Sequence, residues 1–391
     1  MGERREKGTG SITQRKDGRW VGRFDIGIND NGTRHIKYVY GKSEREAKRK
    51  LQELIRSVHA GEIENIQRMI VRDFMDDWLH NVKRNDLKPT SYDRLEATLE
   101  ADVYPYIGNY QVHSIDGDDI TKMLTSLKNA GRSHSTISKA YKAVNACFNY
   151  RLAQGKVTKN PCVGIKIPSK KNFKKKEIVF YTKEEAASLT KTALSNWSND
   201  KPKYPLGAFV PLVLNTGLRA GELLALQWER DVDLESKTIT VRQNVVMTKD
   251  RAKGAEHKFK LIEQDTVKTD AGQGRVIDLN DAAYDALCQL QVKTGQYTWV
   301  MTSRNGTRIM PRQLDQMFRR IETAAGLPEE KIYGVHALRH TFATLLLYNG
   351  VDVKIVSELM GHSDTAITYN TYIHVIQEVK RKAVRAIPKL I

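Results

Sequence analysis

One stretch of the chain reads Val335-His336-Ala337-Leu338-Arg339-His340-Thr341. With about 3.6 residues per turn, a helix here carries His336 on the same face as both Arg339 and His340. The spacing of the two histidines is also that of a zinc-binding helix, but Ala337 stands where a metalloprotease has its Glu, and no Cys lies nearby. We therefore expect no metal here and interpret His340 as a structural histidine that bonds locally.

Three further segments carry polar side chains at turns or helix ends. A tight turn that presents an arginine at a helix start is predicted by Thr216-Gly217-Leu218-Arg219-Ala220-Gly221-Glu222-Leu223. In Leu359-Met360-Gly361-His362-Ser363, Gly361 is expected to end a helix and to leave His362 in the following loop. Two tyrosines precede a histidine in Tyr369-Asn370-Thr371-Tyr372-Ile373-His374-Val375.

Together the four segments resemble the tyrosine recombinase (lambda-integrase-like) family. That family has an Arg in T-G-x-R-x-x-E-L, an H-x-L-R-H block, a G-H-S block and a Tyr shortly before a His. All four occur here in family order with family-like spacing. The resemblance covers at least residues 178–375 and implies a mixed α+β, mainly helical catalytic domain over residues 178–391 with a C-terminal tail. A capping box, Thr182-Lys183-Glu184-Glu185, predicts its first helix.

The residue types in these segments suit the cleavage of a phosphodiester without a metal. That reaction needs a nucleophile, neutralisation of the non-bridging oxygens and an acid for the leaving 5′-oxygen. Tyr372 can supply the phenolate, while Arg219 and Arg339 offer planar forks for phosphate oxygens. The resemblance implies that these two are the family's arginine pair, that His336 is its first histidine and proton acceptor, and that His362 is its second, which bonds the phosphate.

The nucleophile has two candidates. Tyr372 follows His362 by ten residues, within the family's habitual nine or ten, and is followed by Ile373-His374-Val375. Tyr369 follows His362 by seven residues and is the alternative. If Tyr372 is the nucleophile, we expect Tyr369 to be a packing residue on the same segment.

The general acid also has alternatives. The resemblance implies a lysine on a β-hairpin, which we assign to Lys268, before the Ala271-Gly272 turn and the Arg275–Leu279 strand. A preceding strand is expected over Thr238–Val246, and the insertion between the strands is rich in lysine. Further candidates in that insertion are Lys249, Lys253, Lys258 and Lys260.

Length and net charge indicate the number of domains and the class of binding partner. The 391 residues are too many for one ordinary domain, and 64 Lys+Arg against 46 Asp+Glu give a net charge of +18, which favours a polyanionic partner. No stretch approaches the roughly 20 apolar residues that span a bilayer. The three cysteines lie far apart and lack CxxC spacing, so they form neither a disulfide framework nor a zinc site. We expect a soluble protein of a reducing compartment that binds nucleic acid and no membrane.

Residues 1–65 predict a small basic module. Strands are expected over Gly10–Arg15, Trp20–Ile26 and Arg34–Val39, followed by a helix over Ser43–Ala60. Because so small a module buries little, we expect it to carry a binding surface of its own. It resembles the arm-binding domain of phage and conjugative-transposon integrases, which implies that arm-type DNA is its partner. The candidate contacts are Arg19, Trp20 and Arg23.

Residues 66–167 predict a bundle of helices, because apolar residues recur at helical spacing throughout. The bundle is similar to the family's core-binding (SAM-like) domain. Residues 168–177 then form a basic linker, which we interpret as both a connection and a phosphate contact. Its candidate DNA-binding residues are Lys170, Lys171, Lys174, Lys175 and Lys176.

The leading functional hypothesis is a site-specific recombinase (integrase) that integrates or excises a mobile element. By resemblance it forms a 3′-phosphotyrosyl intermediate and a Holliday junction, as a homotetramer on core-type and arm-type double-stranded DNA. An excision factor and a host DNA-bending protein are expected partners, and a bacterial cytoplasm the expected setting. The alternatives are a type IB topoisomerase, which nicks one strand as a monomer, and a catalytically idle DNA-binding regulator. No GxxxxGK[ST] loop is present, so neither ATP nor another cofactor is expected.

Overall fold

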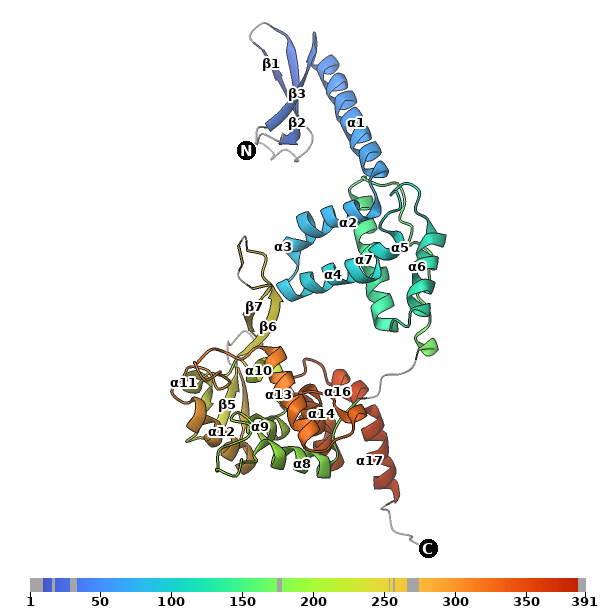
Figure 1. The fold of residues 1–391 in the computed structure, drawn as a ribbon. Helices are drawn as coiled ribbons and strands as arrows, with labels where there is room; N and C mark the ends of the chain where they lie inside the picture. The colour runs from blue at the N-terminus through green and yellow to red at the C-terminus, as the bar shows by residue number, and fades with distance from the viewer. Residues whose placement is uncertain are drawn as a thin grey trace. The chain divides into compact units, whose positions relative to one another are not determined.

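The structure is a computed structural model that describes residues 10–15, 18–28, 34–173, 178–252, 254–255, 257–265 and 274–385 (Figure 1). It divides into two compact units, Met1–Lys174 and Lys175–Ile391. The expected fold class is confirmed: a small sheet with a helix is followed by helical regions and a mixed, mainly helical unit. Among the described helices, none combines the length and the apolar character needed to cross a bilayer.

The N-terminal module is an antiparallel sheet of β1 (Ser11–Gln14), β2 (Trp20–Ile28) and β3 (Arg34–Gly41), with β2 in the middle. Helix α1 (Glu44–Arg68) packs on one face and buries Phe24 and Leu51. The helix approaches the sheet closely, because a Cβ on Gly22 would lie 3.1 Å from the Cβ of Leu51. Helix α1 continues to Arg68, past the expected end at Ala60, and half of residues 61–68 are the good helix formers Glu, Gln and Arg.

The second region is a helical bundle. Helix α2 (Val71–Trp78) continues through a π-helical turn, η1 (Leu79–Lys83), into α3 (Arg84–Asp86). The other helices are α4 (Pro89–Asp102), α5 (Tyr104–Ile107), α6 (Gly117–Asn129) and α7 (His134–Ala153).

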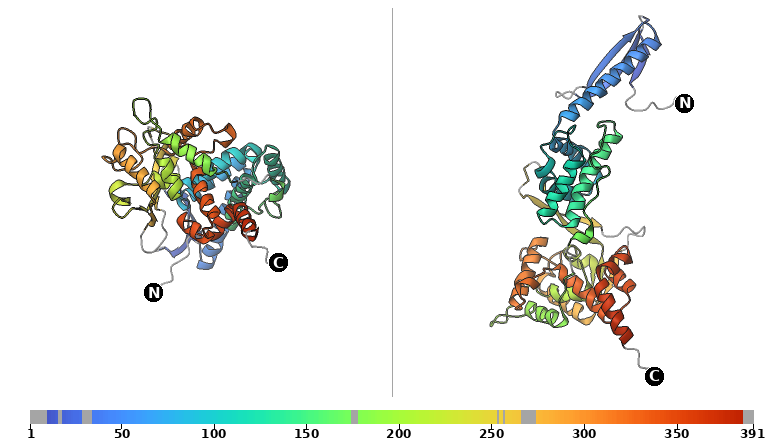
Figure 2. Two further views of the ribbon diagram at one scale, coloured as in Figure 1. Left: turned by 90° about the horizontal axis from the view of Figure 1, so that it is seen from below. Right: turned by 90° about the vertical axis from the view of Figure 1, so that its right-hand side faces the viewer.

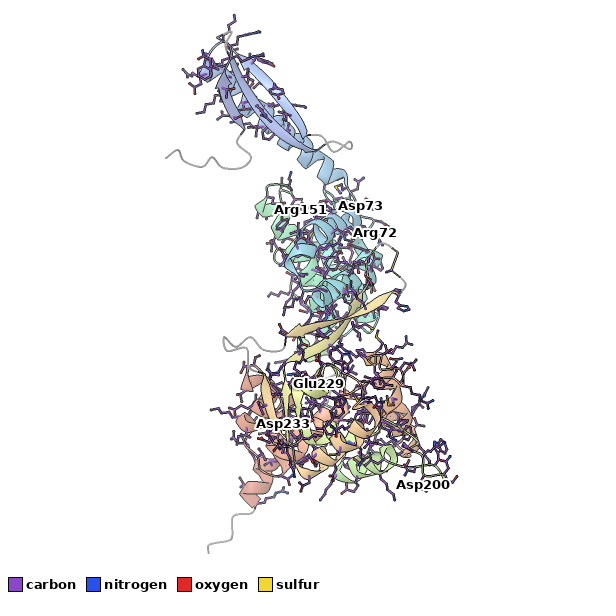
Figure 3. The ribbon with its side chains drawn as sticks, turned by 90° about the vertical axis from the view of Figure 1, so that its left-hand side faces the viewer. Arg72, Asp73, Arg151, Asp200, Glu229 and Asp233 are labelled. Atoms are coloured by element: carbon purple, nitrogen blue, oxygen red, sulfur yellow. The ribbon has the colours of Figure 1, made fainter. Side chains whose placement is uncertain are left out.

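One apolar core holds this bundle together. Phe74 and Phe148 meet there with ring centroids 5.1 Å apart. Each fully buried side chain of this size contributes roughly 1.5–3 kcal/mol. On the surface, Arg151 pairs with Asp77, and Arg72 lies over the ring of Tyr104; both arginines are labelled in Figure 3.

The expected basic linker is partly packed. Lys170 and Lys171 are exposed in a short 3-10 turn, η2 (Lys170–Asn172). Phe173, however, packs against the bundle core, its ring edge-on to His134 at 5.4 Å between centroids. This end of the linker is therefore held against the bundle core. Lys174, Lys175 and Lys176 lie outside the described residues.

The C-terminal unit surrounds one buried helix. α9 (Phe209–Thr216) is apolar on all sides and contacts α8, α12 and α14, as expected for a helix in a core. The capping box predicted at Thr182 is present and begins α8. The helices are α8 (Lys183–Ala193), α9, α10 (Ala220–Leu223), α11 (Trp228–Asp231), α12 (Asp281–Thr294), α13 (Pro311–Ala324), η3 (Glu329–Lys331), α14 (His336–Tyr348), α15 (Val353–Leu359), α16 (Thr365–Thr371) and α17 (Ile373–Arg385).

The strands of this unit form two sheets. β4 (Val232–Asp233), β5 (Thr238–Val241) and β8 (Arg275–Asp278) make one, and β6 (Gln243–Lys249) pairs with β7 (Phe259–Asp265) in the other. The single strand expected over Thr238–Val246 is therefore wrong. It breaks at Arg242, where one half pairs with β8 and the other with β7.

The C-terminal helix α17 lies at the surface of this unit in both views of Figure 2. Ile376 and Val379, in its first half, pack against a small apolar cluster that includes Leu347 of α14 and Val356 of α15. The Tyr348 hydroxyl donates to Glu378 at 2.8 Å. Val384, near its end, is 67% exposed. The start of the tail is thus anchored on its own unit.

Candidate active site

Arg219 is placed by a turn that requires glycine. Helix α9 ends at Gly217, whose φ is +63° and where a Cβ would lie 2.4 Å from the ring of Phe342. The chain then reverses, and Arg219 becomes the residue before α10. Its backbone N–H donates to Glu222 Oε2 at 2.9 Å and its Nη1 donates to Glu222 Oε1 at 2.6 Å. The turn predicted from sequence therefore exists, and a buried carboxylate orients the arginine.

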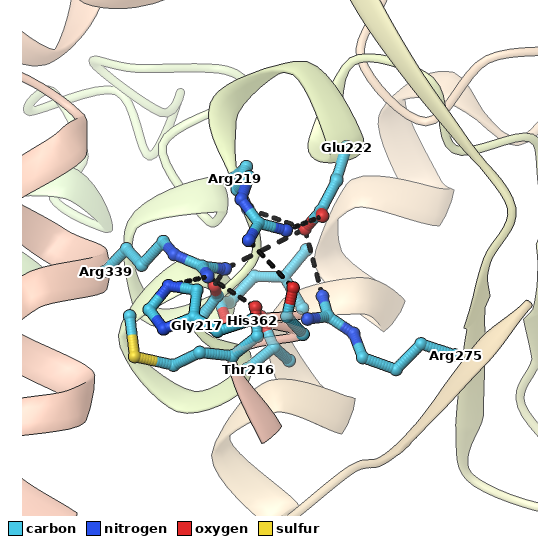
Figure 4. A network of polar contacts seen from close by, with 10 residues as sticks. Thr216, Gly217, Arg219, Glu222, Arg275, Arg339 and His362 are labelled. Atoms are coloured by element: carbon cyan, nitrogen blue, oxygen red, sulfur yellow. Dashed lines mark hydrogen bonds and ion pairs between the residues drawn. The ribbon is translucent and has the colours of Figure 1, made fainter. Parts of the chain in front are cut away.

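Glu222 is the centre of an arginine cluster, which we define as Arg219, Arg275 and Arg339 around this carboxylate (Figure 4). Arg275 Nη2 donates to Glu222 Oε2 at 2.9 Å, and Arg339 Nη1 lies 3.9 Å from the same oxygen. Burial alone would raise the pKa of Glu222, but Arg275 and Arg219 outweigh it and hold that pKa below its ordinary value. Three cations share one anion, so the cluster keeps an excess of positive charge.

Arg339 lies on α14 and is almost fully buried, with 2% exposure. Its Nη1 donates to the Gly217 carbonyl and its Nη2 to the Met360 carbonyl, which fixes the plane of the guanidinium. Burial and the neighbouring Arg219 lower the pKa of Arg339 to about 9, so it remains a cation at neutral pH. A buried cation held by backbone carbonyls is prepared to receive an anion.

His362 lies in the loop after α15, where Gly361 has a φ of +60°. The predicted helix end is therefore present. His362 Nε2 is 3.2 Å from Arg339 Nη2, and its Nδ1 is 2.7 Å from Thr368 Oγ1. The Gly361 carbonyl accepts from Arg219 Nη2 at 2.9 Å, which joins this loop to the arginine cluster. Burial and Arg339 lower the pKa of His362 to about 4, so the ring is neutral at pH 7.

Tyr372 follows α16 and is 1% exposed. Its hydroxyl lies 2.7 Å from Nδ1 of His340, which is on α14. Burial raises the pKa of Tyr372 well above its ordinary value, although Arg339 opposes the effect. The apolar cluster of Ala343, Leu347, Val356, Met360 and Val375 encloses the ring, and we call Tyr372, His340 and this cluster the tyrosine pocket.

Two expectations about this segment are wrong. Tyr369 is not a packing residue: it lies on α16 with 38% exposure, and Lys380 Nζ stands 5.9 Å from its ring centroid. His340 does not bond locally, because its partner Tyr372 lies 32 positions further along the chain. Both follow from the end of α16 at Thr371, which turns Tyr372 inward and leaves Tyr369 on the outer face.

Residues 179–378 match the phage integrase family, and residues 71–167 match the phage integrase central domain. The chain belongs to the phage integrase family. It is a tyrosine recombinase, an enzyme that binds DNA and breaks and rejoins its strands.

Similar proteins of this family align over nearly the full length. A XerC-like tyrosine recombinase of Caldanaerobacter subterraneus subsp. tengcongensis is 31% identical over 93% of this chain and 94% of its own. An integrase of Streptomyces ambofaciens is 23% identical over 99% of this chain and 95% of its own.

Two solved structures share the fold. The Tn1549 transposon integrase in complex with transposon right-end DNA has a TM-score of 0.63 at 23% identity, over 81% of this chain and 99% of that chain. A lambda integrase tetramer bound to a Holliday junction has a TM-score of 0.57 at 15% identity, over 94% and 96%.

The structure brings five of the six expected catalytic residues of this integrase-family chain into one unit: Arg219, His336, Arg339, His362 and Tyr372. The sixth, Lys268, and the alternative Lys253 lie outside the described residues. Lys260 pairs with Asp250 at 3.2 Å, and Lys258 lies 6.0 Å from the ring centroid of Phe259, both on the β6–β7 hairpin.

The candidate contacts of the N-terminal module lie on different faces of the sheet. Trp20 shares the helix-facing side of β2 with Gly22 and Phe24, and is half-buried. Arg23 is exposed on the opposite side, where Tyr38 stands opposite it on β3. Tyr38 is 51% exposed and was not identified from the sequence.

Sequence reasoning also missed three residues of the site. Glu222 was part of a quoted motif but was given no role. Arg275 was seen only as part of a strand, and His340 was assigned to structure. Arg275 lies on the first residue of β8, directly after the segment that contains Lys268, so its position beside a hairpin was the one available signal. A buried carboxylate with three cationic partners cannot be recognised before its partners are placed.

Proposed function

We propose that this chain is the integrase of a mobile element, which cuts and rejoins DNA at specific sites through a 3′-phosphotyrosyl intermediate and a Holliday junction. The observation that carries the proposal is the arginine cluster, with Arg219 and Arg339 on one buried carboxylate and His362 beside them. A phosphodiester carries one negative charge and gains a second as it is attacked, and this cluster has the positive charge to stabilise both.

Each residue has a role in the proposed reaction. The Tyr372 oxygen attacks phosphorus and gives its proton to a histidine of α14, the role that the resemblance assigns to His336. The bond from phosphorus to the 5′-oxygen breaks, and Lys268 gives that oxygen a proton. Arg219 and Arg339 hold the non-bridging oxygens, and His362 hydrogen-bonds the phosphate. The phosphotyrosyl bond conserves the energy of the broken phosphodiester, so a 5′-hydroxyl from another strand can reverse the reaction.

The other regions would select the DNA. We assign residues 1–65 to arm-type sites, 66–167 to core-type sites, 168–177 to a basic linker and 178–391 to catalysis. Arg19, Trp20 and Arg23 would contact arm DNA, and Lys170, Lys171, Lys174, Lys175 and Lys176 core DNA. A chain that holds two sites at once gains effective concentration at each. The active assembly would be a homotetramer in a bacterial cytoplasm, helped by an excision factor and a host DNA-bending protein.

Covalent trapping tests the chemistry. The 391-residue protein is incubated with nicked duplexes from the joined ends of the element that carries its gene, and adducts are separated on a denaturing gel. We expect an adduct from the wild type and from Tyr369→Phe, and none from Tyr372→Phe. If Tyr369→Phe were the only variant to lose the adduct, the nucleophile would be Tyr369. No adduct from the wild type while it still binds these duplexes would contradict the proposal and favour an idle regulator.

A second assay separates the recombinase from a type IB topoisomerase. With two intact duplexes, an integrase yields four-way junctions and recombinants on a native gel, whereas a topoisomerase relaxes a supercoiled plasmid without either product. Removal of residues 1–60 should abolish recombination but preserve binding to core-type duplexes. Loss of core binding as well would show that the N-terminal module has been assigned to the wrong DNA.

A further inference from the structure

The tyrosine pocket contains a contact that the proposed function leaves unexplained. The Tyr372 hydroxyl is 2.7 Å from His340 Nδ1, and the two rings meet at 64° with centroids 5.7 Å apart. His336, the histidine expected to accept the proton, lies one turn earlier with its ring edge-on to that of His340, 4.5 Å between centroids. It is therefore His340 that touches the oxygen which attacks.

The protonation of this pair can be assigned. Burial, together with the neighbouring His336, Arg339 and His362, lowers the pKa of His340 to about 4. These groups face it from each packed element: His336 and Arg339 on α14, and His362 after α15. His340 is thus neutral at pH 7, and the phenolic O–H of Tyr372 donates to its Nδ1.

We propose that His340 is a catalytic residue of the cleavage reaction, which accepts the proton of Tyr372 as the tyrosine oxygen attacks phosphorus. This inference rests on the proposed function and assigns to His340 the role that resemblance gave to His336. In the forward step the O–H bond of Tyr372 breaks, its oxygen bonds to phosphorus, the bond to the 5′-oxygen breaks and the proton moves to Nδ1. In the rejoining step His340 returns that proton.

The same contact keeps Tyr372 protonated, and therefore unreactive, in the absence of DNA. A tyrosine with a raised pKa holds its proton against a histidine with a lowered one, so no phenolate forms in the free protein. A bound phosphate changes this balance in two ways. Its negative charge offsets Arg339, which disfavours a protonated His340, and the phenolic oxygen loses its affinity for the proton as it bonds to phosphorus.

Two substitutions at one position separate proton transfer from positioning. In His340→Asn the side-chain oxygen stands near the place of Nδ1 and still accepts the Tyr372 hydroxyl, but it cannot take up a proton. In His340→Ala both functions are lost. With the nicked duplexes described above, we expect each variant to form adduct about 100-fold more slowly than wild type, the size of a general-base contribution. Wild-type rates in His340→Asn would overturn the proposal, because they would leave only a positioning role.

The pH dependence of the rate of adduct formation separates the two roles, because a purely structural role of His340 would leave its shape unchanged. His340 is already neutral above about pH 6, so the wild-type rate should be nearly flat from there to about pH 9. In His340→Asn the proton must leave to solvent base, and the rate should rise about tenfold per pH unit. The matched variant His336→Asn should keep the flat profile. A rising profile in His336→Asn together with a flat one in His340→Asn would assign the proton to His336 instead.

A modified substrate shows on which side of the phosphate His340 acts. A sulfur in place of the bridging 5′-oxygen leaves without needing a proton, because a thiol is far more acidic than an alcohol. The defect of His340→Asn should persist on this DNA, and its disappearance would mean that His340 serves the leaving group. Equal thermal unfolding of the variants and wild type excludes misfolding as the cause. If the wild type itself forms no adduct, the proposed function fails first; if only His340 is dispensable, the recombinase assignment stands.

Discussion

Around Glu222, three guanidinium groups share one buried carboxylate, whereas around Tyr372 the polar atoms are one phenol and one neutral imidazole in an apolar enclosure. The arginine cluster therefore keeps its charge before DNA arrives, and the tyrosine pocket suppresses charge. Arg339, on the same helix as His340, lies between the two. The contrast teaches that one short segment supplies both a permanent cation for the phosphate and a neutral partner for the nucleophile.

Arg219→Lys is the change expected to act most strongly on the arginine cluster. Lysine keeps the positive charge but cannot bond Glu222 and a phosphate oxygen in the fixed planar geometry of Arg219. Loss of one preorganised transition-state donor costs roughly 100- to 1,000-fold in rate. Adduct formation should fall by this amount in single-turnover assays, while affinity for core duplex stays within a few-fold. Cleavage at the wild-type rate would remove Arg219 from the site.

The sequence predicted most of the individual residues on both sides of this contrast, but not the contacts between them. The arginine turn is local, because Gly217 and Glu222 set it within six residues, and the motif that contains them predicts it. The sheet-plus-helix module and the helical region followed from periodicity in the same way. Local patterns therefore identified the elements and most of the polar side chains of the site.

The rest depended on packing between distant segments. Arg275 reaches Glu222 across 53 positions, and His340 reaches Tyr372 across 32. No period or motif links these pairs. The division of Thr238–Val246 between two sheets had the same origin, since the partners β7 and β8 come later in the chain. The inward turn of Tyr372 likewise follows from where α16 ends.

Glu222→Gln tests whether the carboxylate is what holds the cluster together. Glutamine keeps the shape but leaves three close guanidinium groups with no compensating charge. Breaking a buried ion pair from one side costs roughly 3–5 kcal/mol, and we expect a loss of about this size in the free energy of unfolding by urea. Arg275→Met is the matched control. It removes one of the three cations but leaves Glu222 paired with Arg219 and Arg339, so it should reduce the free energy of unfolding by less. An equal cost for both would contradict a central role for Glu222.

The same carboxylate predicts a pH dependence of stability. The pKa of Glu222 is lowered in the folded protein, because the arginines outweigh the burial that would raise it. Its stabilising contribution is therefore complete above the unfolded-state pKa, ordinarily near 4.5, and is lost as pH falls below that value through the folded-state pKa. Urea unfolding from neutral pH down to acid should show this loss in the wild type. Glu222→Gln should lack that part of the decline, and an identical decline in both would assign it to other carboxyl groups.

The smallest expected effect comes from two glycines that share a backbone conformation but differ in surroundings. Gly361 and Gly350 have φ values of +60° and +81°, so Ala strains either position by roughly 1 kcal/mol. A Cβ on Gly361 would lie 2.2 Å from Arg275 Nη1, whereas one on Gly350 would meet nothing within 4 Å. Both Ala variants should lose similar stability, but only Gly361→Ala should also slow adduct formation, by about tenfold, because Arg275 must move away from Glu222. Equal rates in the two variants would show that Arg275 can move without disturbing the arginine cluster.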